Sequence, residues 1–198
     1  NDTSPKFEIN PRIIDIYNKK LELSNNKFKK INTKTRINRL FIDDDTNDVI
    51  SINEIINYEM LQKAIDTFIN SLKPSEYELK ETHEYTQTLP AKYYEEGSHS
   101  LNRSVAFALK HTDNRLFLSW IMLRSKATDF DYNTIPELYS TWNKHFNKKA
   151  SDGFTKRSIM YWSKQDAFEE YSKVKKDTIS SYMDETLFSQ TDFDLAMV

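Results

Sequence analysis

The residues that most directly suggest catalytic chemistry are the aspartates of the segment Asp43-Asp44-Asp45. A strand through the preceding residues would place Asp43 and Asp45 on one face, a geometry that can hold two metal ions at a phosphoryl-transfer site. Asp44 stands where such a site would have an apolar residue, and no later histidine or basic motif completes it. We favour a solvated turn here, and keep metal-dependent nucleotide incorporation by Asp43 and Asp45 as an alternative.

The other residue types that commonly build active sites are sparse. None of the four histidines has the i, i+4 or H-x-E spacing that brings metal ligands together; they are His83, His99, His111 and His145. Two isolated glycines cannot form a phosphate-binding loop, and the absence of cysteine excludes thiolate zinc sites, thiol nucleophiles and disulfides. We therefore expect no catalytic residue, no metal site and no cofactor in this segment.

A second kind of chemistry is indicated by basic residues interleaved with Trp120, Trp142 and Trp162. Positive charge beside aromatic rings is typical of single-stranded or forked DNA binding, where phosphates are neutralised and bases stack. Because Trp120 and Trp142 fall on apolar stripes, we expect them in the core, with the basic residues contacting phosphate. The candidates are Arg103, Lys110, Arg115, Arg124, Lys126, Lys156 and Arg157. The arginines are favoured because guanidinium makes forked contacts.

The charges are arranged in blocks of alternating sign, although the net charge is only −2. Residues 1–39 carry 10 Lys/Arg and 4 Asp/Glu, residues 40–100 carry 4 and 13, residues 101–176 carry 14 and 8, and residues 177–198 carry 0 and 5. Since local field rather than total charge attracts a polyanion, both basic blocks are candidates for facing nucleic acid. For residues 19–39, a basic arm on nucleic acid and a soluble tether are equally compatible with the composition.

Composition and length favour a soluble intracellular chain of 198 residues with one domain and an arm. No apolar run is long enough to span a bilayer and no signal peptide opens the sequence, so we expect no membrane association. The chain begins without methionine and stops within an apolar run, so we expect a fragment of a longer protein.

Helical periodicity dominates the chain, and the scarcity of glycine disfavours tight hairpins. A helix is expected from Asn10 to about Asn25, and residues 25–50 are expected to be linker or loop. Capping boxes at residues 51–54 and 75–78 predict helices over 53–72 and 76–86. Caps at Ser100, Asp113 and Thr134 predict three short helices, over 101–111, over 114–126 and through Phe146, and a further helical region follows from Thr155 to about residue 187. The expected fold is an all-α small helical bundle with an extended, partly disordered N-terminal arm.

The segment from Tyr93 to Phe146 resembles the type-2 primase C-terminal domain of giant-virus (poxvirus-type) primase-helicases. The resemblance covers about residues 54–174. It rests on Glu59–Leu72, Asn102-Arg103 with Ala108-Leu109, Leu116-Phe117 with Trp120 and Ser125-Lys126, and Trp142 with Phe146. The sequence departs from the family pattern in one place. The second helix of that family often contains a tryptophan, and here this tryptophan is replaced around Asn102–Val105. Packing in that region must therefore differ from the family pattern.

The resemblance implies a non-catalytic connecting domain of a DNA replication protein. It divides the chain into an arm and linker over residues 1–50, the primase C-terminal-like domain over 51–150, and a helical extension over 151–198 leading to a helicase. Implied partners are DNA, the flanking primase and helicase domains, and further copies of the chain through the ring-forming parent helicase, which would act in the host cytoplasm or at a viral replication site. ATP and Mg²⁺ are implied for the parent only. A structural spacer without nucleic-acid affinity is the alternative.

Overall fold

The computed structural model describes residues 18, 38–43, 48–146 and 153–196, with side chains described as far as residue 183 except that of Asp43. The chain divides into two compact units, Asn1–Arg39 and Leu40–Val198. Apart from Arg39, the first residue of β1, every element named below lies in the second unit. The helix expected from Asn10 to Asn25 lies outside the described residues, except for Asn18, which is helical.

A small β-hairpin occupies part of the region expected to be loop. β1 (Arg39–Asp43) and β2 (Asp48–Ser51) form a two-stranded sheet. Leu40 and Ile42 are buried while Phe41 between them is half exposed, so side chains alternate between core and solvent as a strand requires. The loop prediction for residues 25–50 is therefore wrong for both strands, because the alternation is only three residues long and was masked by the acidic run after it.

Helix α2 (Tyr58–Ser71) lies within the predicted range of 53–72, but begins later. Its N-cap is Asn57, whose side chain accepts a hydrogen bond of 2.9 Å from the Met60 N–H. Ser51 makes no side-chain cap, and a single 3-10 turn over Ile52–Glu54 follows it instead. The predicted capping box is therefore wrong, while the apolar stripe is right, since its buried residues recur at helical spacing: Leu61, Ala64, Ile65 and Phe68.

Helix α3 (Tyr77–Thr88) follows a 3-10 turn over Pro74–Glu76. The capping interaction before this helix also lies away from the predicted position, two residues earlier in the chain. The Glu76 carboxylate accepts a hydrogen bond of 3.1 Å from the Lys73 N–H, where the pattern had pointed to Ser75 and Glu78. The helix ends at Thr88, and its C-cap Leu89 has an extended backbone because the residue before a proline, here Pro90, is driven out of the helical region.

Three short helices follow as predicted: α4 (His99–Thr112), α5 (Phe117–Arg124) and α6 (Ile135–His145). The Asp113 carboxylate caps the entry to α5, accepting from the Arg115 N–H at 2.7 Å, which confirms that cap. Neither Ser100 nor Thr134 acts as the predicted side-chain cap: α4 starts at His99, and Thr134 caps nothing with its side chain.

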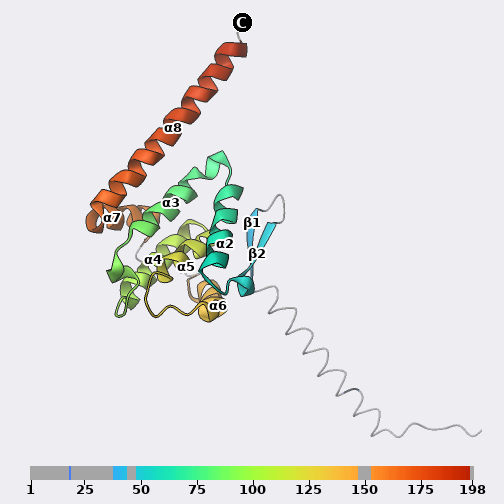
Figure 1. The fold of residues 1–198 in the computed structure, drawn as a ribbon, viewed down its shortest axis with the longest axis vertical. Coiled ribbons are helices and arrows are strands. Elements are labelled where there is room, and N and C mark those ends of the chain that lie inside the picture. Colours follow the sequence, from blue (N-terminus) through green and yellow to red (C-terminus); the bar gives the residue numbers. More distant parts are fainter. Residues whose placement is uncertain (1–17, 19–37, 44–47, 147–152, 197–198) are drawn as a thin grey trace, which may run out of the picture. The chain divides into compact units, whose positions relative to one another are not determined.

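The last helical region is divided in two. α7 (Lys156–Asp166) begins directly after Thr155, where the helical region was predicted to start, and the Thr155 side chain caps it. α8 (Phe168–Ala196) follows after Ala167, whose φ of −150° and ψ of 58° interrupt the helix. Both helices pack on α3 (Figure 1). Tyr171 of α8 stacks on Tyr85 with ring centroids 5.2 Å apart.

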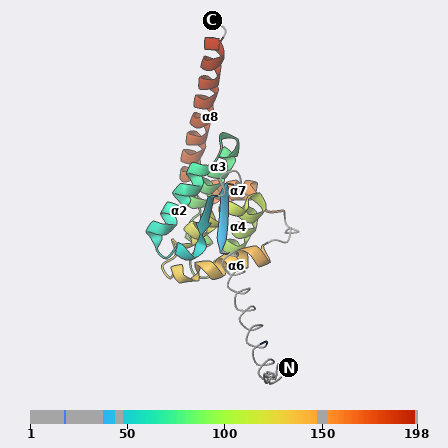
Figure 2. The ribbon, with the colours of Figure 1, turned by 90° about the vertical axis from the view of Figure 1, so that its right-hand side faces the viewer.

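The core lies around α5, whose residues are buried on almost every side, as expected for a helix that is apolar all round. Helices α2, α3, α4 and α6 all contact it (Figures 1 and 2). The prediction of a small helical bundle is confirmed, with the hairpin as its one addition in the part of the chain that the structure describes. No helix among the described residues is long and apolar enough to cross a membrane.

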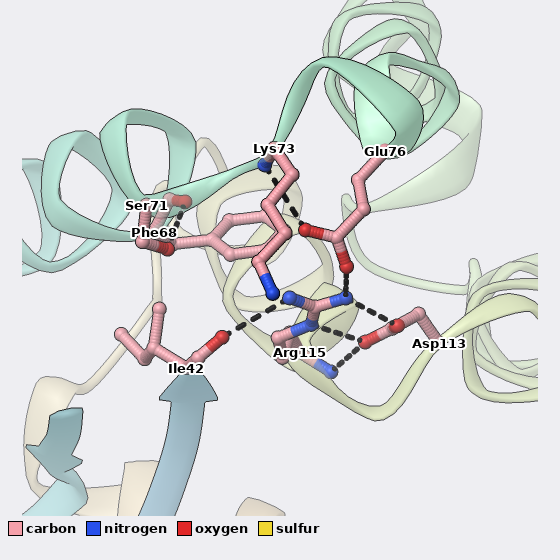
Figure 3. Close-up of polar contacts among 7 residues, drawn as sticks. All are labelled: Ile42, Phe68, Ser71, Lys73, Glu76, Asp113 and Arg115. Atoms are coloured by element: carbon pink, nitrogen blue, oxygen red, sulfur yellow. Dashed lines mark hydrogen bonds and ion pairs between the residues drawn. The ribbon is translucent and has the colours of Figure 1, made fainter. Parts of the chain in front are cut away.

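Arg115 joins the hairpin to the helices (Figure 3). Its guanidinium donates to both carboxylate oxygens of Asp113 at 3.0 and 2.9 Å, to Glu76 at 2.6 Å and to the carbonyl of Ile42 at 3.0 Å. It also lies 5.9 Å from the ring centre of Phe68. The hydrogen bond from Arg115 is the main reason why the pKa of Glu76 lies below its usual value.

Replacing Arg115 with methionine should lower the free energy of unfolding by about 3 kcal/mol, because two carboxylates and a carbonyl lose their shared donor. Arg115→Lys is the matched control, since it keeps the charge but cannot make the forked contacts, and it should lose roughly half as much. Urea unfolding followed by circular dichroism measures both. Equal stability of wild type and Arg115→Met would contradict the structural role assigned to this arginine.

Candidate nucleic-acid interface

The centre of the domain is a stack of aromatic rings. Trp120 and Trp142 lie with ring centroids 5.7 Å apart and an interplanar angle of 27°, and Phe117 and Phe146 close the group from its edges. Both tryptophans are almost completely buried. The prediction that they belong to the core is therefore confirmed, and their rings are not available as exposed platforms for stacking bases.

Each buried indole N–H is satisfied by an asparagine, as a buried polar group requires. Trp142 donates to Asn114 and Trp120 donates to Asn102, both at 3.0 Å. Asn102 is itself buried, and its amide donates to the carbonyl of Tyr93 at 2.8 Å. Asn102 thus uses both ends of its side chain to join α4, α5 and the segment before α4.

The oxygen of Asn102 has a second donor, the guanidinium of Arg124, at 3.3 Å. Arg124 also lies over the Trp120 ring, 5.4 Å from its centre. Its Nε is buried and has no hydrogen-bond partner in the described part of the chain. Burial lowers the pKa of Arg124, and the charge of Asp129 acts in the opposite direction. A guanidinium has five N–H donors, so Arg124 retains donors beyond the bond to Asn102.

Arg124 lines a cleft of about 360 Å³ between α4, α5 and α6, which we call the basic cleft. Its lining contains two arginines and two histidines and no carboxylate. The residues are His99, Asn102, Arg103, Trp120, Arg124, Leu138, Thr141, His145 and Phe146. Arg103, one turn into α4, is exposed, and its guanidinium lies 5.7 Å from the centre of the Phe107 ring. Two of the seven predicted candidates, Arg103 and Arg124, are therefore brought together in one cleft.

A second cleft, the acidic cleft, adjoins the basic cleft and shares His99, Asn102 and Arg124 with it. It is lined by four carboxylates, Glu95, Glu96, Asp129 and Asp131. A polyanion would be repelled from this side and attracted to the other, so the acidic cleft sets the boundary of any phosphate path.

The other candidates are placed elsewhere. Arg115 is held by carboxylates as described above, and Lys156 forms an ion pair with Glu78.

Lys110 lies over the Trp142 ring, 5.4 Å from its centre, and donates to Asn114. Lys126 donates to the carbonyl of Gln87 at 2.5 Å and does not line the basic cleft. Arg157 is exposed in the first turn of α7. The sequence could not show which basic residues are paired with carboxylates, because Glu76 and Glu78 lie far along the chain from Arg115 and Lys156.

No three histidine, aspartate or glutamate side chains converge as metal ligands among the residues that the structure describes. The alternative of a two-metal site at Asp43 and Asp45 concerns side chains outside that description. His83 contacts Ser119 through Nδ1 at 2.9 Å, and burial, followed by the charge of Lys126, lowers its pKa to about 4.

No protein-family model, curated protein or solved structure matches the chain in comparisons with each.

His83 should make the stability of the domain depend on pH. Because its pKa is about 4 in the folded chain and 6.5 ordinarily, the folded chain binds fewer protons between these values than the unfolded chain. Its contribution to the free energy of unfolding is complete above pH 6.5 and is lost as the pH falls towards 4. His83→Gln should flatten this part of the profile, measured by urea unfolding between those limits.

The lowered pKa of His83 can also be measured on the imidazole ring itself. In a proton NMR titration of the folded chain, the His83 ring signal should move only as the pH approaches 4. Movement centred near an ordinary imidazole value would contradict the buried, neutral state.

Proposed function

We propose that the described domain is a non-catalytic DNA-binding domain that holds single-stranded or forked DNA by its phosphates in the basic cleft. The observation that carries this proposal is Arg124, stacked on Trp120 and bonded to Asn102, with donors left over in a cleft without carboxylates. A guanidinium that is already ordered loses little entropy when it binds, and it fits phosphate oxygens in pairs.

The surroundings of Arg124 also favour phosphate over a protein carboxylate. Arg103 adds a second positive charge to the cleft, and His99 and His145 line it with polar ring nitrogens. A phosphate backbone presents negative charges in a row. The carboxylates of the acidic cleft, on the other side of Arg124, confine the strand to one path. Such a site recognises backbone rather than sequence.

For the parent protein we propose a viral primase-helicase, with this domain connecting the primase to the helicase. The support is the resemblance over residues 54–174 and the placement of Trp120, Trp142 and Phe146 as one packed core. In this proposal the flanking domains and DNA are the partners, the parent forms a homo-oligomeric ring, and ATP and Mg²⁺ serve the parent's other domains.

A second candidate function, a spacer that only contacts neighbouring domains, is favoured by a different surface. The hairpin and the residues after it expose apolar side chains, with Phe41 51%, Val49 37% and Ile56 63% exposed. Exposed apolar side chains of this kind are typical of surfaces that contact other proteins. The two functions predict opposite results in a DNA-binding measurement on the whole chain.

The full 198-residue chain should bind fluorescently labelled single-stranded DNA in anisotropy titrations, with affinity falling steeply as salt rises. Arg103→Ala should weaken binding roughly ten-fold and reduce the slope of log affinity against log salt by about 0.7, the value for one phosphate contact on a single strand.

Arg157→Ala is the matched control, since it also removes an exposed arginine but lies outside the basic cleft. It should change affinity less than two-fold or so. Equal losses for Arg103→Ala and Arg157→Ala would contradict the cleft as the site, and absence of binding at low salt would favour the spacer.

A further inference from the structure

The four histidines of the chain differ in what their rings contact. His83 and His111 are held by the protein itself: Nδ1 of His83 lies 2.9 Å from a serine hydroxyl, and Nδ1 of His111 lies 3.1 Å from a backbone carbonyl. His99 and His145 are exposed, and neither ring has a hydrogen bond or an ion pair in the part of the chain that the structure describes. Two imidazoles are therefore used by the fold, and two are open to a ligand.

Both open histidines line the basic cleft, although they belong to different helices. His99 is the first residue of α4, and His145 is the last residue of α6. Arg103 follows His99 by four positions, so these two side chains project from the same face of α4. Arg124 reaches the cleft from the end of α5. Three helices thus bring two permanent cations and two imidazoles to one cleft.

Imidazole differs from guanidinium because its charge changes near physiological pH. Histidine side chains ordinarily titrate between about pH 5 and pH 8, whereas arginine stays charged throughout. A neutral ring has one N–H donor and no charge, and a protonated ring has two donors and a full positive charge. A phosphate diester stays negative over this whole range, so only the protein side of an imidazole–phosphate contact changes. Such a contact therefore becomes stronger as the pH falls.

The charges around the two histidines couple protonation to phosphate binding. His145 shares the basic cleft with two arginines and no carboxylate, and Lys144 precedes it on α6. These cations repel a protonated imidazole, and a phosphate bound in the cleft would offset that repulsion, so proton and phosphate favour each other's binding. His99 also lines the acidic cleft, whose four carboxylates form no ion pair with it in the described residues: Glu95, Glu96, Asp129 and Asp131. On the side of the basic cleft, a bound phosphate would be the first anion that either ring meets.

We infer that His99 and His145 are further phosphate-binding residues of the basic cleft, and that their protonation makes the affinity for DNA rise as the pH falls below neutrality. This inference rests on the proposed function, since it concerns the same cleft, and it adds control by pH. Each proton taken up adds one cation facing the strand, so binding tightens towards about pH 5.5 and weakens towards about pH 7.5. His83 stays neutral over this interval because its pKa is about 4.

The test is an anisotropy titration of the full chain with an oligothymidine of about 15 nucleotides, at about pH 5.5 and about pH 7.5. The strand carries no terminal phosphate, because a phosphomonoester would itself titrate in this interval. Wild type should bind roughly ten-fold more tightly at the lower pH, a factor of about three for each exposed charge-assisted contact. The slope of log affinity against log salt should steepen there by about 1.4, the value for two added phosphate contacts on a single strand. Circular dichroism at both pH values checks that the chain stays folded.

Two double variants assign the change to these two rings. His99→Gln with His145→Gln cannot become charged, so the ratio of the affinities at the two pH values should fall close to one. His99→Lys with His145→Lys is charged at both pH values, so its ratio should also be close to one, but with the tight binding that wild type reaches only at the lower pH. A substitution that merely disturbed the cleft would weaken binding at both pH values and leave the ratio unchanged. His111→Gln is the matched control, because His111 lines neither the basic nor the acidic cleft, and it should keep the full ratio.

The outcomes separate this inference from the proposed function. If the strand binds at neither pH, the proposed function fails and the inference fails with it. If wild type binds with the same affinity and the same salt slope at both pH values, or if the double glutamine variant keeps the ratio, DNA binding stands and the role of the two histidines is wrong. An equal fall of the ratio for His111→Gln would also overturn it, because the effect would then not belong to the cleft.

Discussion

Asn102 is the residue on which the arrangement of this domain depends most. A buried indole N–H and a buried guanidinium both need an acceptor, and the single side-chain oxygen of Asn102 serves both. Its nitrogen is used by the carbonyl of Tyr93, so the amide cannot rotate without leaving a buried group unpaired. This fixes the distance between α4 and α5 and holds Arg124 over Trp120. The same amide therefore pairs a core indole and orients a cation at the surface of the cleft.

The domain uses its positive charges in two different ways. Arg115 and Lys156 are paired with carboxylates and join elements that are distant in sequence, which is a structural role. Arg103 and Arg124 line a cleft from which carboxylates are absent, and they are the residues that a phosphate would meet. The near-neutral total charge of the chain conceals this division. In the proposed function, affinity for a polyanion would therefore belong to one face rather than to the domain as a whole.

The end of α5 is the point at which the acidic cleft and the basic cleft meet. The two clefts share Arg124, the last residue of the helix. A helix C-terminus favours cations because its carbonyls carry partial negative charge. The charge of Asp129, which lines the acidic cleft, also favours the charged form of Arg124, whereas burial disfavours it.

The sequence by itself determined the local features of this protein. Apolar residues at helical spacing placed α2 to α6 correctly to within a few residues. Asp113 was recognised as a cap because a cap bonds to backbone only two or three positions away. Tertiary structure decided everything that depends on distant partners. The hairpin is stable because Leu40 and Ile42 are covered by the helical core, and Arg115 is a structural residue because Glu76, 39 positions earlier, lies against it. Which cations are paired with carboxylates follows from packing between helices, since spacing along the chain carries no information about neighbours that only folding brings together.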